Sequence, residues 1–317
     1  YEIPNPTMRN NLDWSAVDLE ALHIDDIPAT SYKPAGNRAR YDNDFTQWTF
    51  GPARSYYRVA WRAMAANTGE RTLIAAIIPP GAAHPNGVFS AGQSAQSNET
   101  LCVVSSFLSS LIADFAVRAA PTSGIYLPTI NRLPVLLNHP LQKELILRFL
   151  RLNCVTNAYA DLWTDLYHEV FAADQWTSGL SRTNRPNPGD VTQRWTANTP
   201  LRIAEDRRQA LVEIDALVAL MLGVTADQLC TIYRTQFAVL YGYDHNSSVY
   251  DAKGRLVPNE VLSVWRKRGD KITGAERTAT NQAGHTYIYE LPFRRLDREA
   301  VMRTAYAEFE RRLAADG

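Results

Sequence analysis

Alternation of polar and apolar residues is clearest between residues 55 and 62, which read Ser-Tyr-Tyr-Arg-Val-Ala-Trp-Arg. A period of two divides this run between the two faces of a strand. One face carries Tyr56, Arg58, Ala60 and Arg62, and the other carries Tyr57, Val59 and Trp61. The apolar run at residues 73–78 predicts a buried neighbouring strand, joined to the first by a turn at residues 67–69. We therefore expect a hairpin with one basic face and one core face.

The rest of the chain is punctuated by helical periods and by proline and glycine. In chain order, the pattern predicts a short strand at 87–90, a buried helix at 100–118, an extended segment at 125–134, a long helix at 141–173, a helix at 200–222 and a charged helix at 294–315. Gly223 is expected to end its helix, and Thr225 to cap the next one together with Gln228. Residues 178–200 form either a linker or a long ordered loop.

Composition places the chain among folded proteins, with 45% hydrophobic and 21% charged residues and no net charge. Arginine outnumbers lysine 28 to 5, which fits either phosphate and guanine contacts or GC-rich coding. Cys102, Cys154 and Cys230 stand in apolar contexts, so we expect buried free thiols in a reducing, cytoplasmic compartment. No membrane-spanning run and no signal peptide is recognised. Because the sequence begins at Tyr1 without methionine, we expect a longer parent protein.

Motifs for chemistry are missing from the sequence. It contains no nucleophile elbow, Walker-A loop or dinucleotide fingerprint. His168-Glu169 fails as half of a zinc motif because residue 172 is alanine, so no metal ligand is predicted. Asp251 and Lys253, like the acidic pair Asp42 and Asp44, are expected to be turn residues. A hydrolase that uses Asp251 and Lys253 is the weakest of the alternatives.

Basic and aromatic residues alternate between positions 54 and 62. Arginine forks contact guanine or phosphate, and aromatic rings stack on unpaired bases. This favours a nucleic-acid surface that includes Arg54, Tyr56, Arg58 and Arg62. The alternative is an ordinary strand that places Trp61 in the core and leaves its arginines solvated.

Several strings together resemble one protein family. They are residues 57–62 (Tyr-Arg-Val-Ala-Trp-Arg), 70–80 (Glu-Arg-Thr-Leu-Ile-Ala-Ala-Ile-Ile-Pro-Pro), 114–118, 131–134, 250–255 and 297–306. They resemble the target-recognition region of type IIG restriction–modification enzymes and related adenine-N6 DNA methyltransferases, including those of phage-defence systems. In that family the amino-terminal part binds S-adenosylmethionine and methylates a flipped adenine, and the carboxy-terminal part reads the DNA sequence.

The resemblance implies that this chain is the reading half. The family's Asn-Pro-Pro-aromatic loop is absent, because Ile78 and Gly81 occupy its first and last positions around Pro79-Pro80. No catalytic residue and no cofactor is therefore assigned to the chain. S-adenosylmethionine is expected in a methyltransferase domain that precedes Tyr1. The implied partners are double-stranded DNA, that domain and proteins of a defence complex.

The resemblance also implies an architecture and a set of contacts. The expected fold class is α+β, with a mixed-sheet recognition module at residues 1–135 and a mainly helical domain at residues 136–317. Arg58 and Arg62 would contact bases or phosphates. The supporting DNA contacts would be Arg54, Tyr56, Arg71, Asn131 and Arg132, with Arg182, Arg185 and Arg194 on phosphates.

A second hypothesis belongs to another class. The chain would be a protein–protein interaction module of a defence complex, with Trp61 or the helix at residues 294–315 as its anchor and the arginines at the rim. DNA affinity that falls steeply with salt favours the first hypothesis, and salt-insensitive protein binding favours the second.

Overall fold

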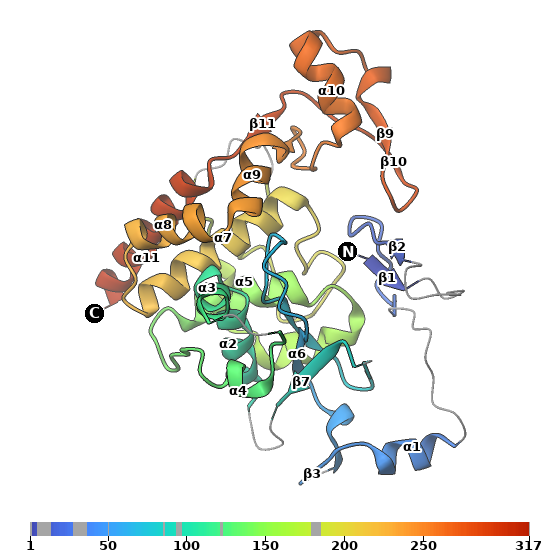
Figure 1. Cartoon of the computed structure of the whole chain (residues 1–317), viewed down its shortest axis with the longest axis vertical. Coiled ribbons are helices and arrows are strands. Elements are labelled where there is room, and N and C mark those ends of the chain that lie inside the picture. The colour runs from blue at the N-terminus through green and yellow to red at the C-terminus, as the bar shows by residue number, and fades with distance from the viewer. Residues whose placement is uncertain are drawn as a thin grey trace.

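The computed structural model describes residues 2–4, 14–27, 37–49, 51–84, 86–92, 97–120, 123–178 and 185–316. The fold is α+β, as predicted (Figure 1). The helices are α1 (Arg38–Asp44), α2 (Asn98–Leu108), α3 (Leu111–Ala119), α4 (Leu127–Ile130), α5 (Gln142–Asn153), α6 (Ala160–Leu166), α7 (Ala204–Met221), α8 (Ala226–Gln236), α9 (Ala238–Asn246), α10 (Asn259–Arg268) and α11 (Arg298–Asp316). The strands are β1 (Glu2–Pro4), β2 (Trp14–Ala16), β3 (Gln47–Trp48), β4 (Gly51–Pro52), β5 (Arg58–Arg62), β6 (Ala75–Ile78), β7 (Val88–Ala91), β8 (Val249–Tyr250), β9 (Thr278–Thr280), β10 (Thr286–Ile288) and β11 (Arg294–Arg295). Short 3-10 turns cover residues 53–55, 157–159, 169–173, 269–271 and 275–277.

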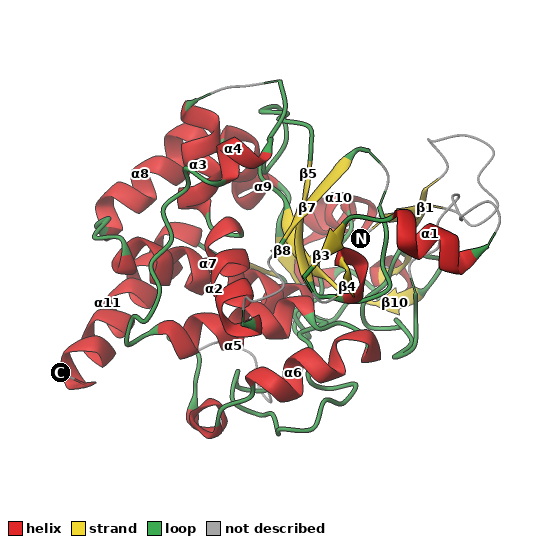
Figure 2. Ribbon diagram, turned by 90° about the horizontal axis from the view of Figure 1, so that it is seen from below, coloured by secondary structure: helices red, strands yellow, loops and turns green. Residues whose placement is uncertain are grey.

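The predicted hairpin is the centre of an antiparallel sheet with the strand order β6-β5-β7. In its register Trp61 lies opposite Ala75 and Phe89, and Ala60 lies opposite Ala76 and Ser90. Val59, Trp61 and Ile77 are buried in the main core, so the predicted apolar face is confirmed. Figure 2 shows this sheet beside the mass of helices.

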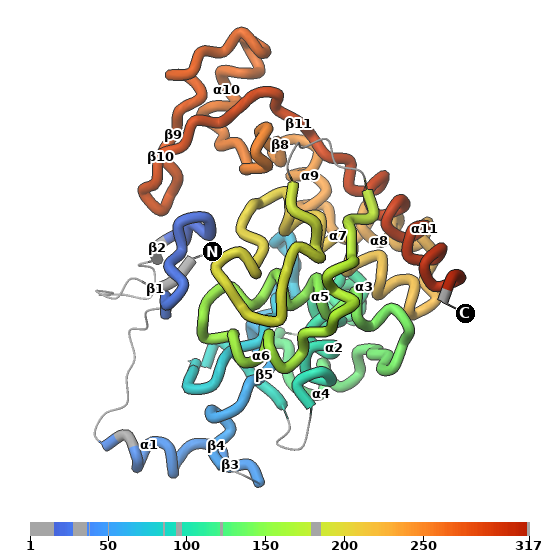
Figure 3. The backbone as a smooth tube through the Cα atoms, turned by 180° about the vertical axis from the view of Figure 1, so that it is seen from behind, coloured from blue at the N-terminus to red at the C-terminus, as the bar shows by residue number. Residues whose placement is uncertain are grey.

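A bundle of helices forms the main body, in which α7 packs against α5 and α11 (Figures 2 and 3). The predicted helix at residues 100–118 is two helices, α2 and α3, bent by 63° at Ser109-Ser110. The hydroxyl of Ser110 accepts a hydrogen bond from the Ala113 N–H, which caps the second helix. The bend follows because serine side chains compete for backbone hydrogen bonds. No described helix is long and apolar enough by itself to cross a membrane.

Two further predictions are wrong in detail. The helix expected at residues 141–173 ends at Asn153 and continues, after Cys154, as 3-10 turns and the short α6. The segment expected to be extended at residues 125–134 contains α4, with Pro128 in its first turn. Proline is compatible with that position because its backbone nitrogen needs no helical acceptor there.

Gly223, with a φ of 69°, and the Thr225–Gln228 capping box are present as predicted.

One hydrophobic core joins the two predicted modules. It contains Trp61 and Phe107 from the first and Leu147, Ile214 and Phe309 from the second. The boundary predicted at residue 135 therefore does not separate two cores. A smaller core inside residues 249–293 contains Val261, Leu262, Ala279, Tyr289 and Phe293. We call residues 249–293 the small subdomain, and Figure 1 shows it in orange at the top.

The loop at residues 185–200 is packed against the body. The Arg151 guanidinium donates to the carbonyls of Asn187, Pro188 and Thr199 at 2.7–2.9 Å. Gly189 lies so close to the turn after α6 that a Cβ there would be 2.5 Å from the Phe171 carbonyl oxygen. The described part of the 178–200 segment is thus an ordered loop.

The segment at residues 16–20 ties the small subdomain to the body. Asp18 accepts hydrogen bonds from three side chains of the β9–β10 hairpin: Asn281 at 2.9 Å, His285 at 3.0 Å and Tyr287 at 2.5 Å. Glu20 pairs with Arg255 at 2.7 Å. Arg202, from the body, holds the same segment by donating to the Leu19 carbonyl at 2.7 Å.

Candidate nucleic-acid interface

The polar face of β5 is covered at its Arg58 end. Arg58 is 2% exposed, and its guanidinium donates to the Ala82 carbonyl at 2.5 Å and to the Ser90 hydroxyl at 3.3 Å. Burial and the nearby Arg54 lower the pKa of Arg58. The expectation that Arg58 faces a partner is therefore wrong for this structure, because the chain after β6 folds over it.

Two of the supporting arginines also have internal partners. Arg54 is buried, forms an ion pair with Asp42 and donates to the Gly81 carbonyl. Arg71 pairs with the buried Asp114 at 2.7 Å and donates to the carbonyls of Ser109 and Ser110, at the carboxyl end of α2. A cation at a helix carboxyl terminus stabilises the helix. Arg54 and Arg71 therefore hold the fold together.

The same face is open at its Arg62 end, where a groove of about 1150 Å³ lies on the sheet. Ala60 and Ala76, which lie opposite each other on β5 and β6, both line the groove. Their side chains are single methyl groups and therefore fill little of it. Arg62 is half-buried and lines this groove. Its Nε is buried without a hydrogen-bond partner, and no hydrogen bond or ion pair is found for its guanidinium among the described residues. Arg62 alone among the arginines predicted on β5 faces an open surface.

The rim of the groove leads to two other predicted residues. Met64 is bridged to Gly124, and the chain continues through Tyr126 into α4. Asn131 and Arg132 follow that helix directly and are exposed. Their side chains make no hydrogen bond or ion pair within the described ranges. Asn131 and Arg132 thus follow the segment that borders the Arg62 groove, and neither residue lines the groove itself.

The remaining predicted residues lie elsewhere. Tyr56 is half-buried beside Trp48, with ring centroids 5.3 Å apart. Arg185 pairs with Asp206 at 2.6 Å and stacks on the Trp176 ring, so its expected phosphate contact has a structural alternative. Arg194 is exposed on the ordered loop. Arg182 lies outside the described residues.

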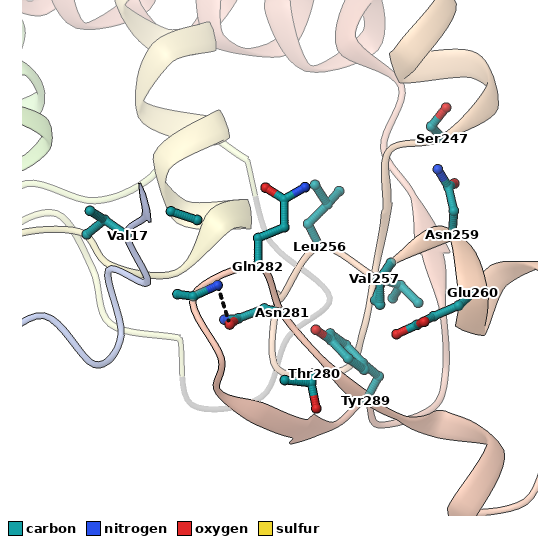
Figure 4. Close-up of a pocket in the computed structure, with 13 residues that line it drawn as sticks. Val17, Ser247, Leu256, Val257, Asn259, Glu260, Thr280, Asn281, Gln282 and Tyr289 are labelled. Atoms are coloured by element: carbon teal, nitrogen blue, oxygen red, sulfur yellow. Dashed lines mark hydrogen bonds between the residues drawn. The ribbon is translucent and has the colours of Figure 1, made fainter. Parts of the chain in front are cut away.

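A cleft that the sequence did not reveal is lined by both the segment at residues 16–20 and the small subdomain (Figure 4). It contains two connected hollows of about 620 and 910 Å³ that share Val17, Ser247, Leu256, Asn281 and Tyr289. Figure 4 shows Asn259, Glu260 and Gln282 around the first hollow. The contacts that form this cleft join residues more than 230 positions apart, so no local pattern could predict it.

Asp251 and Lys253 do not form a hydrolytic site. Asp251 is fully buried and accepts from the N–H groups of Lys253, Arg255 and Glu290, which fixes a turn. The Lys253 ammonium pairs with Glu290 at 2.7 Å. Among the described residues no group of three His, Cys, Asp or Glu side chains could hold a metal ion. The three cysteines are buried and free, as predicted.

Comparison with known proteins adds no relative. No family model matches the chain, and no curated protein or solved structure matches it either.

Proposed function

We propose that this chain is the DNA target-recognition part of a site-specific adenine-N6 DNA methyltransferase, with or without a fused restriction activity. The observation that carries the proposal is Arg62, which lines an open groove and whose guanidinium has no hydrogen bond or ion pair with any described residue. An arginine that makes no hydrogen bond or ion pair with the described residues of its own fold is suited to bind an acceptor on another molecule. The motif resemblance between residues 57 and 80 supports the same assignment.

The sheet gives Arg62 the rigidity that sequence reading requires. Its strand pairs on both sides with β6 and β7, so the backbone that carries the guanidinium is fixed. A fixed fork can bind the O6 and N7 acceptors of guanine in two parallel hydrogen bonds. Asn131 has the amide that reads adenine, and Arg132 and Arg194 supply exposed charge for phosphates.

The test is duplex binding by the full chain, after selection of preferred sites from a random DNA library. Arg62→Ala is expected to lower affinity for the selected site by about 5- to 150-fold, equivalent to about 1–3 kcal/mol, and to relax one base position. Arg62→Lys keeps the charge and loses the fork, so it is expected to relax the same position with a smaller loss of affinity. Unchanged affinity and preference in both variants would contradict the assignment of Arg62.

Arg132→Ala is the matched comparison for a phosphate contact. It is expected to weaken binding equally on all sequences and to reduce the slope of log K against log salt by about one.

The chain is proposed to hold no cofactor, with S-adenosylmethionine bound by a methyltransferase domain elsewhere in a cytoplasmic parent protein. Calorimetry should therefore detect no S-adenosylmethionine binding by this chain, and measurable binding would contradict that part.

A second function is favoured by the rim of the same groove. Met64 is 63% exposed, Tyr126 54% and Ile74 51%, and clustered exposed apolar side chains mark protein interfaces. In this alternative the chain is an interaction module of a defence complex. This alternative would be established in place of DNA recognition if the chain bound a protein partner with an affinity that does not depend on salt and did not bind duplex DNA.

A further inference from the structure

The small subdomain carries a surface that is suited to a polyanion and lies apart from the Arg62 groove in the sequence. The last turn of its helix α10 and the 3-10 turn that follows carry four basic residues against one acidic residue: Arg266, Lys267, Arg268 and Lys271 against Asp270. All five are exposed. Three of the five lysines of the chain lie in this subdomain. We call the exposed residues 266–271 the rim of the small subdomain. Clustered positive charge of this kind attracts anionic partners.

The four basic side chains are not equivalent. Arg266 donates to the Asn246 carbonyl, and Arg268 pairs with Glu276. Lys267 and Lys271 lie four residues apart and make no hydrogen bond or ion pair with any residue that the structure describes. These two ammonium groups are therefore the cations of the rim that remain available to a partner.

A two-stranded ribbon stands next to this rim. The strands β9 and β10 pair antiparallel, with Thr280 opposite Thr286 and Thr278 opposite Ile288. These four side chains are exposed, whereas Ala279, between two of them, is buried in the subdomain core. The outward face of the ribbon thus carries three hydroxyls, and those of Thr280 and Thr286 lie 2.8 Å apart.

The ribbon is held in place at its inner face and at its hairpin turn. Its inner face packs into a core that α10 shares, and Asp18 binds its hairpin through Asn281, His285 and Tyr287. Because α10 contacts both β9 and the 3-10 turn at residues 275–277 that precedes it, the rim and the ribbon belong to one packed surface. Such a surface can place a phosphate contact and a groove contact at a fixed separation.

We propose that residues 249–293 form a second contact with duplex DNA, in which the outer face of the β9–β10 ribbon enters the major groove and Lys267 and Lys271 bind flanking phosphates. This inference rests on the proposed function, since it assigns the same partner to a different surface. The major groove is wide enough for a two-stranded ribbon. Threonine offers a hydroxyl for base edges and a methyl group for contact with thymine. An RNA helix presents a narrow, deep major groove that would exclude the ribbon.

The first test measures duplex affinity of the full chain over a range of salt concentrations. The double variant Lys267→Ala/Lys271→Ala is expected to reduce the slope of log K against log salt by about two, with no change in sequence preference. Lys143→Ala removes an exposed lysine of α5 and controls for long-range charge, so it should leave the slope within error.

The second test locates the ribbon on the DNA. Thr280→Cys is expected to form a disulfide with a thiol tethered in the major groove of the bound duplex, while Thr304→Cys, exposed on α11, is expected not to. A wild-type salt slope in the double lysine variant together with no cross-link would overturn the inference and leave the role of Arg62 intact. If the wild-type chain binds RNA hairpins or anionic vesicles in preference to duplex DNA, the inference is also overturned. If it binds no duplex at all, the proposed function itself fails.

Discussion

The side-chain amide of Asn153 pairs with both backbone groups of Ile77, as a neighbouring strand would. Its Oδ1 accepts from the Ile77 N–H at 2.9 Å, and its Nδ2 donates to the Ile77 carbonyl at 3.2 Å. The outer edge of β6 is thereby closed by one residue at the end of α5. An edge that is paired in this way is protected from pairing with another chain.

Asn153→Ala should destabilise the fold by about 1–3 kcal/mol, because the buried Ile77 N–H loses its acceptor. Tyr159→Phe should cost less, since the Ile77 carbonyl accepts from the Tyr159 hydroxyl at 3.0 Å and keeps Asn153 when that hydroxyl is removed. Urea denaturation gives both values. Asn157→Ala, at an exposed position of the same region, serves as the control. Equal stabilities for Asn153→Ala and Asn157→Ala would contradict this account of the edge.

Arg58 and Arg62 lie four residues apart on one face of β5, and their substitution should have different effects on stability. Arg58→Ala should lower the free energy of unfolding by about 2–3 kcal/mol, because a charged donor to the Ala82 carbonyl is lost from a buried site. Arg62→Ala should stay within about 0.5 kcal/mol of the wild type, since no described group depends on it. Denaturation curves measured beside the DNA titrations separate folding from binding. A large loss of stability in Arg62→Ala would show that its binding data report misfolding.

Asp114 is a buried carboxylate that accepts hydrogen bonds from three groups. It accepts from the Arg71 Nε at 2.7 Å, the Arg118 Nε at 3.3 Å and the Thr72 N–H at 3.0 Å. Asp114→Ala should destabilise the protein by about 3–5 kcal/mol, because it leaves two guanidinium groups without their counter-charge. Glu310→Ala, at an exposed position of α11, should change stability by less than about 0.5 kcal/mol. A loss of under 1 kcal/mol for Asp114→Ala, on the order of an exposed ion pair, would contradict the central role of this carboxylate.

Asp215 should make the stability depend on pH in a defined direction. Burial raises the pKa of Asp215 from 3.8 to about 6, while its Oδ1 accepts from the Leu111 N–H at 2.7 Å. Between these two pH values the folded state holds a proton that the unfolded state has lost. The contribution of Asp215 to stability is therefore complete below pH 3.8, declines as pH rises and levels off above about 6.

Asp215→Asn removes this titration and keeps an oxygen that can accept from Leu111. The difference in free energy of unfolding between the variant and the wild type should shift by about 2–3 kcal/mol in favour of the variant as the pH rises from 4 to 7. Urea denaturation at both pH values measures the difference. Parallel changes in the two proteins would rule out Asp215 as the source.

The sequence predicted those features that depend on neighbours along the chain. The faces of β5, the buried partner strand and the Thr225–Gln228 cap follow from spacing alone, because side-chain direction in a strand or at a helix end is a local property. The break at Ser109-Ser110 was missed because an apolar period continues across it. The serine that caps the second helix there looks like an ordinary polar position.

The candidate site was predicted less well, for a physical reason. Arg58 and Arg62 are equivalent in a strand pattern, and the chain after β6 covers only Arg58. Which arginine remains exposed is decided by that long-range contact. The same holds for Arg71, whose partner Asp114 lies 43 positions away, and for the cleft beside the small subdomain.

The tie between Asp18 and the β9–β10 hairpin has a consequence for the order of assembly. Asp18 and Tyr287 are 269 positions apart, and Glu20 and Arg255 are 235 apart. During synthesis the early segment therefore emerges long before its partners exist. Contacts of such separation form late, because a long loop must close before they are gained. Nascent chains stalled before residue 255 should consequently leave residues 16–20 open to proteases, and protection should begin only once the small subdomain has left the ribosome.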